Sequence, residues 1–450
     1  MYLKDTPPFT PNNSDEAIME AEDELYEEDV IEVIDFDPSN AHEDSSDDEG
    51  NCTRVEEGIR NVIDEKAVIE ISDSDDDDAS PINVNAYSRD AEGNKPTRDD
   101  ASCIFQQHKG SVFCCHLEPK VGNLAVTGAE DDMAFVWKTN SGEIILNCTG
   151  HKDSVTCVQF SHDGTYVATG DMSGVVKVWK ISSKSQVWET SVGDLTWLKW
   201  HHGANVLLGG TISGEVYMWR IPVGDWKLLP GHGSKTDYGL ILPDGKRAAV
   251  GYEDGSIKIF DMKAATVVHH IPQDQAHTGP ITDMDCHSDN NLLISGGVDG
   301  HAVVLKTQTG KIASVLDCND SNQGAESGSN TSSVEAVGFC KEGSLSLAAT
   351  GNLDGVLCIW DISKGVLRHK VKQDAGITKL LWIKNSPLLY TAGFDGSIRL
   401  YDGRNGELQN QLLGHSNCIL DMSLSTDCRT LLSSSDDKTA RVFSLQLPDE

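Results

Sequence analysis

The stretch that decides the fold is TGNLDGVLCIWD, residues 350–361. In its second half Leu357 and Ile359 alternate with other residues, and a period of two is typical of a strand with one face more buried than the other. Asp354 and Gly355 stand just before this run. An Asp-Gly pair between two apolar runs predicts a tight hairpin, because glycine readily adopts the positive φ that such a turn needs.

The same pattern recurs along the chain. A large apolar or aromatic residue closes each copy at intervals of 40 to 45 residues, apart from one interval of 55. These closing residues are Trp137, Trp179, Trp219, Phe260, Leu305, Trp360, Tyr401 and Phe443. A repeat of this length made of short strands is typical of a β-propeller, in which each copy is one blade. The eight copies therefore predict an all-β, eight-bladed propeller over residues 101–450.

Other positions of the repeat resemble the WD40 family, which has a histidine early in each copy, Asp-Gly late and a closing Trp-Asp. In that family a histidine, a hydroxyl, an aspartate and the tryptophan form a buried hydrogen-bonded tetrad. The resemblance implies a complete tetrad of His108, Thr127, Asp131 and Trp137 in the first copy. In the last copy it implies His415, Ser433 and Asp437, with Phe443 in place of the indole. The second copy has Ser173 where the acid is expected, and the third and fourth lack the hydroxyl, at Gly209 and Val250.

A recurring Ser/Thr, His and Asp set also raises the question of nucleophilic catalysis. An enzyme needs one such constellation, whereas a propeller needs one in each blade, so the recurrence favours a structural role. No phosphate-binding loop or nucleophile elbow is present, and the pairs His201-His202 and His269-His270 lack companion ligands at metal spacing. We expect no catalytic residue, no metal and no cofactor. The twelve cysteines form no Cys-x-x-Cys pair, and we expect them to be small buried apolar residues.

The two ends of the repeat region predict how the ring closes. Only seven residues follow Phe443, too few for a turn and a fourth strand. Just before His108 stands an apolar run, Cys103-Ile104-Phe105, in the place that the outer strand takes before other copies. We therefore expect residues 102–107 to complete the last blade and leave no open sheet edge.

Charge is distributed unevenly. The chain has 36 Lys and Arg against 71 Asp and Glu, a formal net charge of −35, and its first hundred residues are especially acidic. Such a segment cannot bury enough apolar surface to offset its chain entropy, so residues 1–100 are predicted to be a disordered acidic tail. The acidity argues against direct binding of nucleic acid, which needs clustered cations. No apolar run is long enough to cross a bilayer, and no basic start precedes an apolar stretch. We expect a cytoplasmic location, with nuclear or peripheral membrane locations also open.

Two apolar islands interrupt the tail: Val30-Ile31-Glu32-Val33-Ile34-Asp35-Phe36-Asp37 and Val68-Ile69-Glu70-Ile71. Both have the composition of peptides that add a strand to the edge of a partner's sheet. The second also resembles a SUMO-interacting motif, because serines and aspartates follow it. The alternative is that both are apolar residues of a disordered tail with no partner.

In the family that the repeat resembles, partners bind on the face that bears the Asp-Gly turns, around the central channel. Carboxylates expected to be exposed there are Glu130, Asp132, Asp153, Asp171, Glu253 and Asp374. Such a rim suits a Lys/Arg-rich peptide through steering and register. The alternative is an acidic surface with no partner. Residues 319–332, rich in Ser, Asn and Gly, account for the long interval and are expected to be a loop on this face.

Several strings resemble one branch of the WD40 proteins, the angio-associated migratory cell protein family: residues 108–137, 150–157, 168–174 and 243–248. The resemblance covers residues 100–447 and extends only loosely into the tail. It implies a monomeric, non-catalytic platform for binding proteins. One relative in fungi is a chaperone for a basic large-subunit ribosomal protein, which suits an acidic propeller. The resemblance equally leaves open a signalling scaffold in cell migration and angiogenesis.

Overall fold

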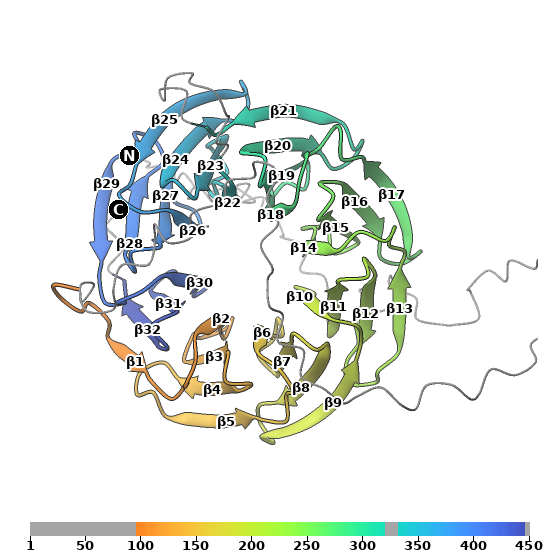
Figure 1. Ribbon diagram of the computed structural model, residues 1–450, viewed down its shortest axis with the longest axis vertical. Helices are drawn as coiled ribbons and strands as arrows, with labels where there is room; N and C mark the ends of the chain where they lie inside the picture. Colours follow the sequence, from red (N-terminus) through yellow and green to blue (C-terminus); the bar gives the residue numbers. More distant parts are fainter. Residues whose placement is uncertain (1–95, 320–331, 446–450) are drawn as a thin grey trace, which may run out of the picture. The chain divides into compact units, whose positions relative to one another are not determined.

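The computed structural model describes residues 96–319 and 332–445. The expectations for the acidic tail, for its two islands and for most of the 319–332 loop therefore lie outside the described residues. The described chain forms eight four-stranded antiparallel sheets, arranged as blades around a central channel (Figure 1). The fold is the expected eight-bladed propeller. Within these residues, no helix has the length and apolarity that crossing a bilayer requires.

In blades 1 to 7 the strands follow chain order from the innermost to the outermost, and blade 8 differs only in its outermost strand (Figure 1). Blade 1 consists of β2 (Val112–Leu117), β3 (Leu124–Ala129), β4 (Ala134–Lys138) and β5 (Ile144–Cys148), and blade 2 of β6 (Val155–Phe160), β7 (Tyr166–Asp171), β8 (Val175–Lys180) and β9 (Ser185–Ser191). Blade 3 consists of β10 (Leu195–Trp200), β11 (Val206–Thr211), β12 (Val216–Arg220) and β13 (Trp226–Leu229), and blade 4 of β14 (Thr236–Ile241), β15 (Arg247–Tyr252), β16 (Ile257–Asp261) and β17 (Thr266–Ile271).

Blade 5 consists of β18 (Ile281–Cys286), β19 (Leu292–Gly297), β20 (His301–Lys306) and β21 (Ile312–Asp317), and blade 6 of β22 (Val334–Phe339), β23 (Leu347–Asn352), β24 (Val356–Asp361) and β25 (Val366–Lys372). Blade 7 consists of β26 (Ile377–Trp382), β27 (Leu388–Gly393), β28 (Ile398–Asp402) and β29 (Leu408–Leu412). Blade 8 has β30 (Ile419–Leu424), β31 (Thr430–Ser435) and β32 (Ala440–Ser444), and its fourth strand is β1 (Cys103–Phe105).

The ring closes by pairing the two ends of the described chain. Strand β1 is antiparallel to β32, with Cys103 opposite Val442 and Phe105 opposite Ala440. The Phe105 ring is 1% exposed and stacks on Trp137 of blade 1, with ring centroids 4.6 Å apart. The closing strand therefore seals blade 8 and also packs against the next blade.

Residues that directly precede β1 also contact the propeller. The backbone N–H of Asp100 donates to the carbonyl of Leu413 at 2.8 Å, and the Asp100 carboxylate accepts the N–H of Leu413 at 2.8 Å. Arg98 donates to the carbonyl of Gln411, also at 2.8 Å. Residues 98–100 are thus attached to blade 7, because unpaired backbone groups of its outer strand bind them.

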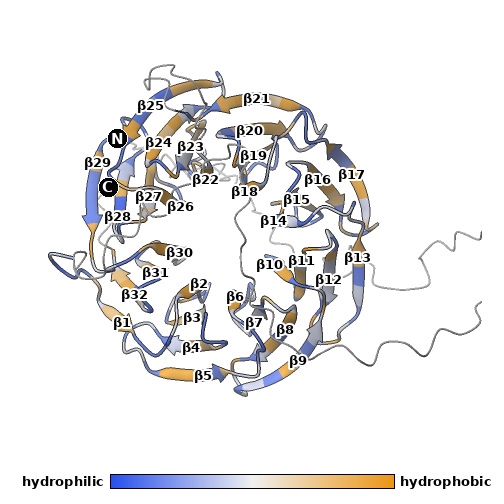
Figure 2. Cartoon of the chain, in the orientation of Figure 1, coloured by the Kyte–Doolittle hydropathy of each residue, from blue (hydrophilic) through white to orange (hydrophobic). Residues whose placement is uncertain are grey.

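The core lies between neighbouring blades. One apolar cluster, for example, joins Leu208 and Met218 of blade 3 with Val250 and Phe260 of blade 4, and all four are almost fully buried. Figure 2 shows the contrast with an outermost strand such as β29, which is largely hydrophilic. Burial between every pair of blades supplies the main stabilisation, since buried apolar area dominates folding energetics.

Buried tetrads join the turns to the middle strands. In blade 1, His108 lies 3.1 Å from Asp131 and 2.9 Å from the Thr127 hydroxyl, which also accepts the indole N–H of Trp137 at 3.3 Å. In blade 8, His415 lies 2.9 Å from Asp437 and 2.7 Å from Ser433. Blade 5 has a similar set, His277 with Asp299 and Ser295. In each set the histidine satisfies a buried acid and a buried hydroxyl, which would otherwise be costly to bury.

Candidate protein-binding surface

One backbone hydrogen bond recurs in every blade and places the residue that follows the second strand. In blade 1 the N–H of Glu130 donates to the carbonyl of Ser111 at 3.0 Å, and in blade 2 the N–H of Met172 donates to Ser154 at 3.0 Å. The accepting residue stands just before the innermost strand. The eight residues so placed are Glu130, Met172, Ile212, Glu253, Val298, Leu353, Phe394 and Asp436. They occupy equivalent positions around one mouth of the channel, and we call them the turn-face ring.

The turn-face ring combines acidic and apolar side chains. Three members are carboxylates: Glu130 in blade 1, Glu253 in blade 4 and Asp436 in blade 8. The apolar members include Met172, Ile212 and Val298, which are 50%, 48% and 43% exposed. Exposed apolar groups close to carboxylates are typical of surfaces that bind a partner.

The carboxylates of the ring are oriented by the turns around them. Glu130 accepts the backbone N–H of Ser111 at 3.1 Å, and Asp436 accepts the hydroxyl of Ser111 and the side-chain amide of Asn417. Ser111 thus links blades 8 and 1. Within the described residues, neither Glu130 nor Asp436 nor Glu253 forms an ion pair, so their negative charge is available to a cationic partner.

Five of the six predicted rim carboxylates are exposed: Glu130, Asp132, Asp153, Glu253 and Asp374. All five lie on the end of the propeller that bears the turn-face ring. Two of them, Glu130 and Glu253, are members of the ring itself. Exposure on this face keeps these residues candidates for partner binding.

The interpretation of Asp171 as an exposed rim residue is wrong. Its side chain is fully buried, and it provides the acid of the blade 2 tetrad, 3.0 Å from His151. Burial alone would raise the pKa of Asp171, but hydrogen bonds from the N–H of Lys152, the hydroxyl of Ser173 and the N–H of Val175 lower it below its usual value. Ser173, expected to stand in for the acid, instead donates to it at 2.7 Å.

Other blades replace members of the tetrad. In blade 4, Ser256 supplies a hydroxyl 3.2 Å from His232, although Val250 lacks one. In blade 7, Gln373 takes the histidine's place and donates to the hydroxyl of Thr391 at 2.9 Å. The expectation that blade 4 has no hydroxyl at the usual position holds, but its histidine still has a polar partner from the turn.

The apolar members of the turn-face ring were not anticipated from the sequence. Met172, Ile212, Val298, Leu353 and Phe394 stand in the same register of the repeat as Glu130 and Glu253. Their position relative to the turn acid was therefore a usable signal. Charge alone, in contrast, identifies only the carboxylates of this register.

The described residues offer no group of three or more His, Cys, Asp or Glu side chains arranged to hold a metal ion. The His, Thr/Ser and Asp sets that resemble catalytic triads have their histidine rings buried beneath the turns. What this end of the propeller offers chemically is an amphipathic, negatively charged surface.

Comparison with known proteins agrees with the repeat. The WD domain, G-beta repeat model matches residues 142–180, 268–304, 365–402 and 406–444. The chain is 45% identical over 355 residues to the angio-associated migratory cell protein of Canis lupus familiaris and 44% identical to that of Homo sapiens; each match covers 78% of this chain and 81% of the relative. Ribosome assembly protein SQT1 of Saccharomyces cerevisiae is 23% identical, over 79% of this chain and 86% of SQT1.

Solved structures show the same fold. The structure of Chaetomium thermophilum Sqt1 bound to the N-terminus of ribosomal protein L10 superposes with a TM-score of 0.69 at 20% sequence identity, covering 77% of this chain and all of that one. The Saccharomyces cerevisiae Sqt1 structure also gives a TM-score of 0.69. The repeat, the propeller and the close relatives together identify a protein-interaction platform: the chain belongs to the angio-associated migratory cell protein family of WD40 repeat proteins.

Proposed function

We propose that the turn-face ring binds a Lys/Arg-rich segment of a large-subunit ribosomal protein, and that the chain acts as a non-catalytic chaperone for that protein before ribosome assembly. The observation that supports this most is the composition of the ring, with carboxylates in blades 1, 4 and 8 and exposed apolar residues between them. A basic segment has clustered Lys and Arg, which bind the phosphates of nucleic acid when nothing covers them. The Sqt1 relatives support the proposal, because one is described bound to the N-terminus of ribosomal protein L10.

Electrostatics gives the proposal a testable form. Glu130 and Asp436 are joined through Ser111, so two carboxylates lie in adjacent blades. Lysine and arginine side chains beside them would gain attraction that salt screens over about 10 Å at 0.1 M ionic strength. Binding should therefore be fast at low salt and should weaken steeply as salt rises.

The experiment measures the affinity of a labelled peptide from the N-terminus of the large-subunit protein by fluorescence anisotropy. The double variant Glu130→Lys/Glu253→Lys should bind roughly a hundredfold more weakly, equivalent to about 2–3 kcal/mol. The control is Glu143→Lys/Glu407→Lys. It makes the same change in net charge at exposed residues in the turns between third and fourth strands, at the other end of the propeller. Equal affinity for both double variants would refute the proposal.

A second candidate is a signalling scaffold in cell migration and angiogenesis, which the names of the relatives at 44–45% identity favour. Such a scaffold would bind folded partners and would not need the acidic members of the turn-face ring. Failure to bind the basic peptide, together with recovery of the same folded partners by wild type and by Glu130→Lys/Glu253→Lys, would favour this candidate.

A further inference from the structure

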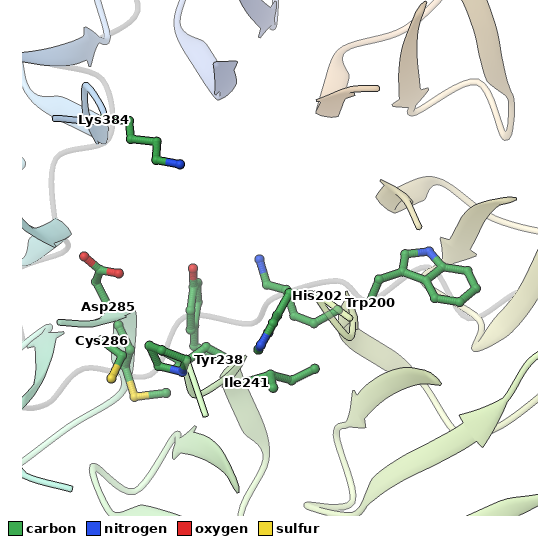
Figure 3. A pocket seen from close by; sticks show the side chains of 11 residues that line it. Trp200, His202, Tyr238, Ile241, Asp285, Cys286 and Lys384 are labelled. Carbon is green, nitrogen blue, oxygen red and sulfur yellow. The ribbon is translucent and has the colours of Figure 1, made fainter. Parts of the chain in front are cut away.

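A hollow lies at the end of the channel opposite the turn-face ring. It is a cavity of about 750 Å³, formed where the innermost strands of blades 3 to 5 end and where the first loop of blade 7 approaches them. We call it the lysine pocket and define it by Lys199, Trp200, His202, Ile241, Met284 and Lys384. Figure 3 shows Lys384 reaching into this space from one side and Asp285 and Tyr238 facing it from the other.

The pocket has an excess of positive charge. Within the described residues neither Lys199 nor Lys384 forms an ion pair, whereas the pocket's carboxylate, Asp285, is already neutralised. Asp285 accepts the Nζ of Lys341 at 2.7 Å and the backbone N–H of Phe339 at 2.8 Å. The two lysines therefore remain without an anionic partner in a partly enclosed space.

Two deeper carboxylates among the described residues, Asp283 and Asp421, attract Lys199 but form no ion pair with it, and they are shared with other donors. Asp283 accepts the backbone N–H of Val337 at 2.9 Å, and Asp421 accepts the N–H of Cys115 at 3.1 Å. Both carboxylates also attract Lys379, and this attraction holds the lysine's pKa above its usual value although burial alone would lower it. Burial is the main influence on Lys199 and the positive charge of Lys379 adds to it, so the pKa of Lys199 lies below the usual value although Asp421 and Asp283 attract this lysine too. An anion beside Lys199 would offset the free-energy cost of burying its positive charge.

The other side chains that line the pocket are apolar or, like His202, neutral hydrogen-bond donors. Leu240, Ile241 and Pro243 offer apolar surface to the hollow, whereas Trp200, Met284 and Cys286 are almost completely buried. Burial lowers the pKa of His202, so its imidazole is neutral near pH 7 and offers a hydrogen bond rather than a charge. A ligand that fits this pocket has an apolar body and at least one carboxylate.

We propose that the lysine pocket binds the chain's own segment of residues 30–37, Val-Ile-Glu-Val-Ile-Asp-Phe-Asp. The segment has five apolar residues, three carboxylates and no cation. Its apolar side chains match the apolar lining of the pocket and its carboxylates match the two lysines, whereas the acidic turn-face ring would repel it. In the other island, residues 68–71, the aspartates follow the apolar run instead of alternating with it.

The length of the chain permits this contact. Arg98 attaches the start of the propeller to the outer strand of blade 7, and 58 residues separate Asp37 from Pro96. By random-coil scaling 58 residues span roughly 40 Å on average, so the length of the connection allows the segment to reach the pocket. Tethering at this length gives an effective concentration on the order of millimolar, so even a weak contact would be substantially occupied.

The experiment uses the full chain with Phe36→p-benzoylphenylalanine, a photo-reactive residue, and maps cross-links by mass spectrometry. We expect links within one molecule to Leu240 or Ile241, the partly exposed apolar residues of the pocket. The double variant Lys199→Gln/Lys384→Glu should lower their yield about tenfold, since it removes one attraction and reverses another. The matched control, Lys120→Glu, changes an exposed lysine in the corresponding loop of blade 1 and should leave the yield unchanged.

Thermal unfolding of each variant checks that it folds. If the double variant does not fold, Lys384→Glu alone, at an exposed residue, should still lower the yield about threefold. Links to the turn-face ring, links that join two molecules, or yields unaffected by the lysine variants would overturn the proposal. So would an equal yield from the same photo-reactive residue placed at position 71.

Discussion

Replacing Phe105 by alanine should destabilise the whole propeller, although the strand that contains it has only three residues. The ring is 1% exposed, stacks on Trp137 at 4.6 Å and lies 5.7 Å from the rings of both His108 and Phe135. Truncating a buried phenylalanine costs about 3–5 kcal/mol through lost transfer energy and the cavity left behind. The neighbouring Ile104 is only half-buried, so Ile104→Ala should cost roughly 1 kcal/mol.

Thermal unfolding followed by circular dichroism measures the difference. A propeller of this size unfolds with an entropy of about 2 cal/mol/K per residue, so Phe105→Ala should lower Tm by about 5 °C and Ile104→Ala by 1–2 °C. Deleting residues 1–95 should leave Tm unchanged, and deleting residues 1–106 should lower it further than Phe105→Ala, because β1 then also leaves β32 unpaired. Equal Tm values for the two deletions would refute the closure of the ring through β1.

Three further predictions concern buried acids and the ring. Asp171→Asn should destabilise the protein by about 2–3 kcal/mol in chemical denaturation, and Ser173→Ala by only about 1 kcal/mol. The Asp171 carboxylate satisfies several buried donors, whereas the Ser173 hydroxyl satisfies one acceptor. A larger effect of Ser173→Ala would contradict the assignment of the tetrad acid. Burial alone would raise the pKa of Asp437, but His415 and the hydroxyl of Thr439 lower it to about 2, below the unfolded value near 3.8. The carboxylate's contribution to the free energy of unfolding, roughly 2 kcal/mol, is therefore present above pH 4 and lost as the pH falls towards 2. When chemical denaturation is compared at pH 5 and pH 3, Asp437→Asn should lose less stability than wild type. Met172→Ala should weaken binding of the basic peptide about tenfold without changing its salt dependence, since it removes apolar contact and no charge; a changed salt slope would show that the residue acts through its neighbours' charges.

Most of the architecture was predictable because the repeat constrains it eight times. The Asp-Gly turns, the alternation before each closing residue and the spacing together determined the blades, and no single copy had to match perfectly. Leu305 shows this: it closes blade 5 without an aromatic ring, yet it is fully buried like Trp137. Closure through Cys103–Phe105 was predictable because the last copy of the repeat has only three strands, and this segment supplies the fourth by pairing with β32.

The details of the turns were less predictable, because more than one residue can perform the same physical task. A buried histidine needs an acid nearby, but the backbone allows that acid two places earlier, at Asp171, when the usual position holds Ser173. The sequence contained both candidates and no spacing rule chose between them. Burial decides, and burial depends on how the turn is folded over the histidine.

The recurring backbone hydrogen bond explains why the turn-face ring can differ between blades without disturbing the fold. The bond from Glu130 to Ser111 uses an N–H and a carbonyl, which almost every residue has, and the same bond forms with Met172, Val298 or Asp436 in that place. At Met172, Ile212 and Val298 the side chain is then left exposed, whereas the carboxylates of Glu130 and Asp436 also accept hydrogen bonds from the turns. Tetrad acids such as Asp171 are the opposite case, since their side chains satisfy buried donors and cannot change freely. An acid on this face can therefore serve the proposed binding surface where its side chain stays exposed, as at Glu130 and Glu253, and not where it is buried in a tetrad, as at Asp171.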